Sequence, residues 1–166
     1  MNAAKPSKAT KKPKKAAKGR KAAKAVTLGP PRRQVAALPW RRTDRLEIML
    51  VSSRETRRWI IPKGWPMAGR SDSAAAAIEA MEEAGLLGVI SPEPLGHYCY
   101  VKKFSPGEEA VVRVDVFALR VARQRESWPE KGQRVTQWFP AEEALGFVSD
   151  PELRDLFAEF IRALNL

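Results

Sequence analysis

The chain has 166 residues, enough for one domain with a buried core and too few to expect two. Its net charge of +11 is concentrated at one end, because residues 1–29 hold ten of the 30 Lys and Arg residues and no Asp or Glu. No run of about 18 apolar residues occurs, which argues against a membrane span, and the single cysteine, Cys99, excludes an internal disulfide and fits a reducing cytoplasm.

The N-terminal segment 1–29 differs in composition from the rest of the chain. It consists mainly of Lys, Ala, Pro and Gly and contains no aromatic side chain. A segment of this kind buries too little apolar surface to fold alone, so we predict a disordered basic tail at 1–29 and one folded domain at 30–166. The positive charges of the tail would hold nucleic acid or another polyanion without specificity, or would only keep the protein in solution.

The first part of the domain is predicted to form a β-hairpin followed by a stiff loop. Folding is expected to begin near Gln34, and the apolar runs at 35–38 and 46–51 flank a polar turn, as in two paired strands. The segment 62–66, Pro-Lys-Gly-Trp-Pro, combines two prolines with a glycine. This composition argues against regular structure there.

The clearest helix of the sequence follows this loop. Residues 74–84 are rich in strong helix formers, residues 71–73 offer N-caps, and Gly85 supplies the C-terminal stop. Beyond the helix, the runs at 96–101 and 111–121 have the β-branched and alternating character of two antiparallel strands.

The C-terminal part is predicted to return from strand to helix. A loop at 123–132 precedes a short strand at 136–139. Helical patterns follow at 141–145 and 151–166, and the second of these opens with Asp150 before a proline, a favourable helix start.

Three glutamates occupy one face at the end of the helix predicted for 74–84. Glu79, Glu82 and Glu83 have i, i+3 and i+4 spacing, so a helix places them on one side. The carboxylates repel one another and the negative end of the helix unless a cation compensates. Mg²⁺, with Mn²⁺ as a substitute, suits oxygen ligands and phosphates. The alternative interpretation is the solvated face of an amphipathic helix.

The spacing around these glutamates resembles the signature of the Nudix hydrolase family. Gly64 stands at the first glycine of the signature, and residues 79–86, Glu-Ala-Met-Glu-Glu-Ala-Gly-Leu, match its closing part in register. Two positions depart, because Arg70 replaces a glutamate and Ile78 replaces an arginine. In the family these two residues commonly pair and hold the loop against the helix. The resemblance therefore implies that one structural ion pair is lost while the metal-binding carboxylates remain.

The resemblance covers most of residues 32–160 and is closest to the diphosphoinositol-polyphosphate phosphohydrolase-like group, through the segments 51–54 and 58–62. It implies an α/β fold, an α/β/α sandwich around a mixed β-sheet. It also implies Mg²⁺-dependent hydrolysis of a diphosphate linkage in a phosphorylated small molecule. Diphosphoinositol polyphosphates, dinucleoside polyphosphates and other nucleoside diphosphates linked to a further group are the candidate substrates, since fold does not fix substrate.

The same resemblance assigns roles to individual residues. Glu79 and Glu83 would hold Mg²⁺, and Glu82 would hold a further ion or take the proton from the attacking water. Glu130 is a second candidate base, although an exposed loop acid is its simpler interpretation. A nucleotide substrate would also need an aromatic stacking partner such as Trp65 or Trp128, and the equal alternative is that both are packing residues. The candidate substrate-binding residues are a glycine and five basic residues, some of them expected to be ordinary surface charges: Lys63, Gly64, Arg33, Arg54, Arg113 and Arg134.

Two other classes of function remain open at this stage. The departures at Arg70 and Ile78 allow a catalytically inactive Nudix domain that acts as a ligand sensor. The basic tail allows a protein that binds nucleic acid or other polyanions. His97 and Cys99 would share one face of a strand, but no third group completes a catalytic arrangement, so both are interpreted as sheet residues.

Overall fold

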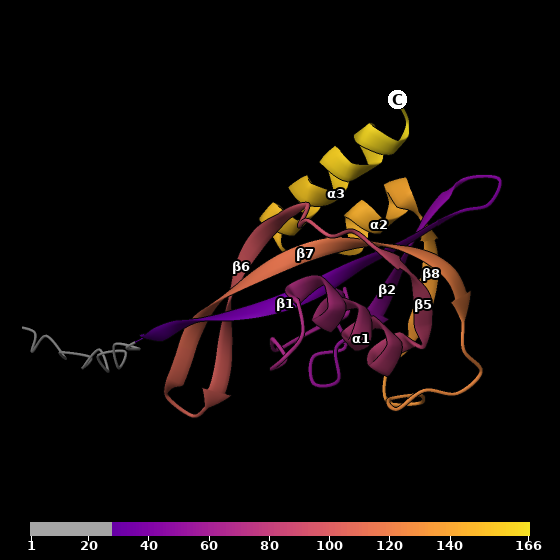
Figure 1. Ribbon diagram of the computed structural model, residues 1–166. Coiled ribbons are helices and arrows are strands. Elements are labelled where there is room, and N and C mark those ends of the chain that lie inside the picture. The colour runs from indigo at the N-terminus through magenta and orange to yellow at the C-terminus, as the bar shows by residue number, and fades with distance from the viewer. Residues whose placement is uncertain (1–27) are drawn as a thin grey trace, which may run out of the picture.

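The fold is a mixed β-sheet with helices on both faces (Figure 1). A computed structural model describes residues 28–166, so the predicted disorder of the tail falls almost wholly outside the described residues. Eight strands form the sheet: β1 (Leu28–Arg42), β2 (Leu46–Ser52), β3 (Trp59–Ile60), β4 (Lys63–Gly64), β5 (Leu86–Ile90), β6 (Gly96–Ser105), β7 (Glu108–Gln124) and β8 (Thr136–Pro140). Three helices complete it: α1 (Asp72–Ala84), α2 (Ala141–Phe147) and α3 (Pro151–Leu164).

The strand order explains why the sheet is mixed. The central path runs β3-β2-β1-β7-β5, while β4 pairs with β1, β6 with β7 and β8 with β2. The long strands β1 and β7 run parallel, and the other pairs are antiparallel. The predicted mixed sheet is therefore confirmed.

Each face of the sheet has its own apolar core. Along β1, Val35 and Ala37 pack under α1, whereas Ala36 and Leu38 belong to the cluster that holds α2 and α3. This alternation is the two-residue period of a strand that is covered on both sides. The predicted α/β/α sandwich is confirmed, and α1 lies on the face opposite α2 and α3.

Most predicted elements are present at the expected places. The hairpin β1–β2 pairs antiparallel around the turn, and β6 pairs with β7. Helix α1 begins after Ser71, whose hydroxyl accepts a hydrogen bond from the Ala74 N–H, and ends at Gly85 with φ 70°. A positive φ favours glycine, which is why this stop could be predicted from the sequence. Asp150 is the N-cap residue of α3, although its side chain makes no capping hydrogen bond.

Four strand predictions were wrong or missing, and one of them is β3, the short strand Trp59–Ile60 that pairs with β2 and was not predicted. Strand β1 starts at Leu28 rather than near Gln34, and the Pro30-Pro31 pair falls within the register shift between Gly29 and Arg32. The segment predicted as a loop contains β4, which pairs with β1. The two prolines of the segment lie outside the paired residues, so they do not interrupt the pairing. Strand β5 was not predicted. It follows the helix stop directly and contains a glycine, so no apolar alternation marks it.

The helices of residues 28–166 include none with the length and hydropathy to cross a membrane.

Candidate active site

A polar pocket of about 660 Å³ lies beside α1, between the loop after β2, the β4 segment, the β6 strand and the loop before β8. Its acidic lining consists of Glu55, Glu79, Glu82, Glu83 and Glu130. Its basic lining consists of Arg54, Arg58, Lys63, Lys102, Lys103 and Arg134. Carboxylates that face several cations across one hollow are suited to a metal ion and phosphate groups.

Glu83 is the most enclosed carboxylate of α1, with only 4% of the residue exposed. Its Oε1 accepts a hydrogen bond from Arg134 Nη2 at 3.1 Å, while its Oε2 is buried without a partner among the described residues. Burial raises the pKa of Glu83 to about 7, although Arg134 and Lys63 act in the opposite direction. Such an unpaired buried oxygen costs free energy unless a cation or a proton meets it.

Glu79 reaches the pocket because residue 64 has no side chain. A Cβ atom on Gly64 would lie 2.1 Å from Glu79 Oε1, far inside van der Waals contact. The pKa of Glu79 is raised, mainly by burial and then by the charge of Glu82. The glycine therefore allows a helix carboxylate to lie directly against the β4 backbone.

Glu130 lies in the loop between β7 and β8, which contacts the C-terminal end of α1. Its backbone N–H donates to the Glu82 carbonyl at 3.0 Å. Its carboxylate pairs with Arg54 at 3.3 Å and with Arg134 Nε at 3.6 Å. Since Arg134 also bonds Glu83, the two carboxylates and two arginines form one connected chain of charges. Glu130 is therefore not the free loop acid of the simpler interpretation.

Lys63 is the basic pocket residue that lies on β4. The pairing of β4 with β1 sets Lys63 opposite Ala36. Its ammonium lies 5.5 Å from the centre of the Tyr100 ring, and burial lowers its pKa to about 8. Among residues 28–166 it forms no ion pair within 4 Å, so it is available to an anionic ligand.

The structure divides the predicted substrate-binding residues into two groups. Those that line the pocket are Lys63, Gly64, Arg54 and Arg134. Arg33 and Arg113 do not line it, and they pair instead with acidic residues near the start of α1. The cause is strand alternation, which points Arg33 to the face opposite its pocket-lining neighbour Gln34.

Several pocket residues were missed from the sequence. The Tyr100 hydroxyl donates to Gln34 Oε1 at 2.7 Å and both side chains line the pocket, as does Arg58. Tyr100 and Lys102 both line the pocket and lie two residues apart on β6. Because residues two apart on a strand point to the same side, the alternation of this strand is the signal that could have identified the tyrosine. The two predicted stacking residues also separate: Trp65 is exposed at the pocket, whereas the Trp128 ring packs against Gly85.

The donor set fits Mg²⁺. Within residues 28–166, no three Asp, Glu, His or Cys side chains are gathered closely enough to hold a metal by themselves. Magnesium does not need such a cage, because it uses one or two carboxylates together with water and substrate phosphates. The free Oε2 of Glu83 and the neighbouring carboxylate of Glu79 offer that number of ligands.

The α/β/α sandwich carries three glutamates of α1 at a pocket lined by acidic and basic side chains, which is the arrangement that the Nudix resemblance implied. The NUDIX domain model matches residues 30–164, and the chain therefore belongs to the Nudix family, as its sequence predicted. Its relatives include Nudix hydrolase 12, mitochondrial, from Arabidopsis thaliana, which is 32% identical over 125 residues, or 74% of this chain. The chain spans only 62% of the length of that plant protein.

Other relatives and solved structures agree with the family assignment. Diphosphoinositol polyphosphate phosphohydrolase 3-alpha from Mus musculus is 30% identical over 138 residues, which cover 81% of this chain and 79% of the mouse protein. An Ap4A hydrolase from C. elegans has a TM-score of 0.59 at 19% identity and covers 81% of this chain and 99% of its own. A NUDIX hydrolase from Nitrosomonas europaea has a TM-score of 0.61 at 20% identity, over 81% of this chain and 90% of that one. These two structures support the fold alone.

Proposed function

We propose that the chain is a Mg²⁺-dependent pyrophosphohydrolase that cleaves a diphosphate linkage in a phosphorylated small molecule. The observation that carries the proposal is the buried Oε2 of Glu83, which has no partner among the described residues. Glu83 and Glu79 both line the pocket, which also holds basic side chains. The name of the mouse relative, a diphosphoinositol polyphosphate phosphohydrolase, agrees with hydrolysis of such a linkage, and the plant relative is named a hydrolase.

Each residue of the pocket is proposed to have a separate role in this reaction. Glu79 and Glu83 would hold Mg²⁺, which when bound neutralises phosphate oxygens and makes a water more acidic. Glu82 is the better placed acceptor for the proton of the attacking water, because its carboxylate forms no ion pair within residues 28–166. Glu130 is the weaker candidate, since Arg54 and Arg134 already engage its oxygens. Lys63 would bind a phosphate oxygen.

The substrate should carry more than two phosphates. Six basic side chains and five glutamates line the pocket. Three of the basic residues, Arg58, Lys63 and Lys102, form no ion pair among residues 28–166, and three such cations favour a polyphosphorylated compound. Diphosphoinositol polyphosphates and dinucleoside polyphosphates both meet that condition. Trp65 is 41% exposed and stacks on Phe104 with 6.3 Å between ring centres. Its exposed ring could stack on a base, so nucleotides remain candidate substrates.

The test is release of phosphate or nucleotide from a substrate panel, with Mg²⁺ or with a chelator. The panel contains diphosphoinositol polyphosphates, diadenosine polyphosphates, ADP-ribose and nucleoside triphosphates. We compare the wild type with Glu83→Gln, which keeps the hydrogen-bond acceptor for Arg134, and with Glu143→Gln on the exposed face of α2. Turnover that needs Mg²⁺, falls at least about a hundredfold in Glu83→Gln and persists in Glu143→Gln is expected.

Absence of turnover on every substrate, together with tight binding of one of them, would replace this proposal by the ligand-sensor function. Arg70 and Ile78 at the two departing positions motivate that alternative. Polyanion binding by the basic tail is compatible with either function and concerns residues that the structure does not describe. The cytoplasmic location stays a prediction, since the name of the first plant relative places that protein in mitochondria.

A further inference from the structure

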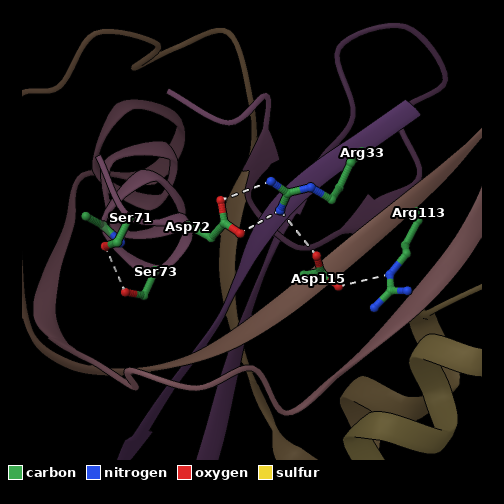
Figure 2. A network of polar contacts seen from close by, with 7 residues as sticks. Arg33, Ser71, Asp72, Ser73, Arg113 and Asp115 are labelled. Carbon is green, nitrogen blue, oxygen red and sulfur yellow. Dashed lines mark hydrogen bonds and ion pairs between the residues drawn. The ribbon is translucent and has the colours of Figure 1, made fainter. Parts of the chain in front are cut away.

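A network of ion pairs joins the start of α1 to two strands of the sheet (Figure 2). Arg33 on β1 directs its guanidinium to both oxygens of Asp72, with Nη1–Oδ2 at 2.6 Å and Nη2–Oδ1 at 3.3 Å. The same Nη1 lies 3.4 Å from Asp115 Oδ2 on β7, and Arg113 Nε bonds the other oxygen of Asp115 at 3.1 Å. Three elements, β1, β7 and α1, therefore meet at one guanidinium.

The Arg33 network, defined as Arg33, Asp72, Asp115 and Arg113, lies at the start of α1. The pair of positions at which the chain departs from the Nudix signature is Arg70, before the helix, and Ile78, in its middle. Arg70 is exposed, and its guanidinium takes part in none of the ion pairs of residues 28–166. The second position of that pair holds an apolar side chain, Ile78. Among the ion pairs of residues 28–166, the one between Arg33 and Asp72 joins the start of α1 to the sheet.

The apolar face of α1 does not supply this contact by itself. It meets the sheet through alanines, Ala75, Ala76, Ala80 and Ala84, whose short side chains form a smooth surface. Such a surface allows close approach but interlocks little, so it resists sliding or rotation less than large side chains do. A fork of two hydrogen bonds from a guanidinium to a carboxylate is directional and fixes both position and rotation.

We propose that Arg33 is a positioning residue, which fixes the first turn of α1 on β1 and β7 and thereby sets the place of Glu79 and Glu83 in the pocket. Asp72 is the first residue of the helix, where a negative charge also favours the macrodipole. Glu79 follows about two turns later on the same rigid element, so a shift at Asp72 moves the carboxylates with it. The link to metal binding rests on the function proposed above, whereas the anchoring of α1 does not.

The test compares Arg33→Gln with Arg32→Gln, a matched control. Arg32 is the neighbouring residue, and its side chain is 43% exposed against 45% for Arg33. It pairs with Glu108 at 3.6 Å and lies over the Phe104 ring, and it forms no ion pair with α1 among the described residues. Backbone hydrogen exchange of α1 in the metal-free protein is measured first. Arg33→Gln should speed exchange of the α1 amides about threefold to tenfold, because it removes the ion pairs of Arg33 with Asp72 and Asp115. The control should leave this exchange unchanged.

Mg²⁺ affinity and steady-state kinetics give the second readout. In Arg33→Gln we expect about threefold to tenfold weaker Mg²⁺ binding and a lower kcat with an unchanged substrate KM, since Arg33 does not line the pocket. Arg33→Lys, which keeps the charge but not the fork, should recover part of the loss. In a double-mutant cycle, Asp72→Asn should add little to Arg33→Gln, because both remove the same contact.

Two results would overturn the proposal. One is α1 exchange in Arg33→Gln that equals the exchange in the Arg32→Gln control. The other is a raised substrate KM with unchanged exchange and unchanged Mg²⁺ affinity, which would return Arg33 to the substrate-binding role predicted from the sequence. If the wild type itself binds no Mg²⁺, the proposed function fails, and the exchange result alone still decides whether Arg33 anchors α1.

Discussion

The charge state of Glu83 depends on a balance between burial and neighbouring cations. Burial favours the neutral acid, while Arg134 and Lys63 favour the carboxylate, and the balance leaves its pKa at about 7. A bound divalent cation would shift this balance strongly toward the charged form. The metal-free protein should therefore show the cost of charging Glu83 in its stability.

We expect the stability of the metal-free protein to depend on pH through Glu83. The folded state keeps the proton up to about pH 7, whereas an unfolded chain releases it near the ordinary value of 4.5. Ionisation of Glu83 therefore lowers the free energy of unfolding as pH rises from about 4.5 to 7. Relative to Glu83→Gln, the wild type should lose on the order of 1–3 kcal/mol between pH 5 and pH 8.

Urea unfolding with a chelator at pH 5, 6 and 8 measures this difference. Glu143→Gln, which changes an exposed glutamate, should show a difference from wild type that stays constant with pH. A constant difference for Glu83→Gln as well would mean that Glu83 ionises in the folded protein as it does in the unfolded chain.

Gly64 offers a second test, through the space that it leaves for Glu79. In Gly64→Ala the added Cβ would lie 2.1 Å from Glu79 Oε1, so the flexible glutamate must rotate away. We expect Mg²⁺ affinity to fall about tenfold or more while the free energy of unfolding changes by less than about 1 kcal/mol. Isothermal titration with Mg²⁺ and chemical unfolding check the two parts.

Gly146→Ala is the matched control for this substitution. A Cβ at Gly146 would meet nothing within 4 Å, and the residue lies in α2, away from the pocket lining. It should leave Mg²⁺ binding unchanged and stabilise the helix by roughly 0.5–1 kcal/mol. Equal Mg²⁺ affinity in the two variants would show that the position of Glu79 does not matter for the metal.

The elements differ in how far the sequence could predict them. Helix α1 could be predicted because its caps, its composition and its stop at Gly85 are all local signals. Strands β4 and β5 could not, because their pairing partners, β1 and β7, lie far away in sequence and supply the order that the local residues do not. The missed elements are thus those whose structure is set by a partner.

An aromatic contact adds to the hydrogen bonds and ion pairs that hold the loop between β7 and β8. The Trp128 ring lies where a Cβ on Gly85 would be, 2.4 Å from its Cε3, and this contact holds the loop that carries Glu130 against the end of α1. Its Nε1 is buried without a hydrogen-bond partner among the described residues. The indole N–H therefore contributes no hydrogen bond, while the ring contributes packing and lies 5.1 Å from the Lys131 ammonium.

Trp128→Ala and Trp128→Phe should separate these two aspects. The alanine variant removes the packing, so we expect a loss of about 1–3 kcal/mol in the free energy of unfolding and faster hydrogen exchange in residues 125–135. The phenylalanine variant keeps most of the packing and deletes the unpaired N–H, so its stability should change by less than about 1 kcal/mol. If both variants lose the same stability, the indole N–H has a partner in solution.

The whole molecule explains which site residues the sequence identified. The glutamates of α1 and Gly64 were found because their spacing along the chain is itself the signal. The four predicted arginines cannot be told apart by residue type. Only Arg54 and Arg134 line the pocket, whereas Arg33 and Arg113 do not. Which arginines reach the pocket depends on the side of the sheet to which Arg33 points and on the parallel pairing that sets Arg33 opposite Arg113. Both depend on the assembled sheet rather than on a local sequence pattern.

The distribution of charge leads to a final prediction. Residues 1–24 contain ten Lys and Arg residues and no acid, so their removal lowers the net charge from +11 to +1 while β1, which starts at Leu28, stays intact. Retention on DNA or heparin depends on the number of cations, whereas hydrolysis depends on the pocket. We expect the shortened protein to lose retention at about 150 mM salt and to keep kcat/KM within about twofold.

Salt-gradient chromatography and turnover of the same preparations measure both quantities. Retention that survives the deletion would place the polyanion-binding surface on the folded domain, and a large fall in kcat/KM would make the tail part of the substrate site.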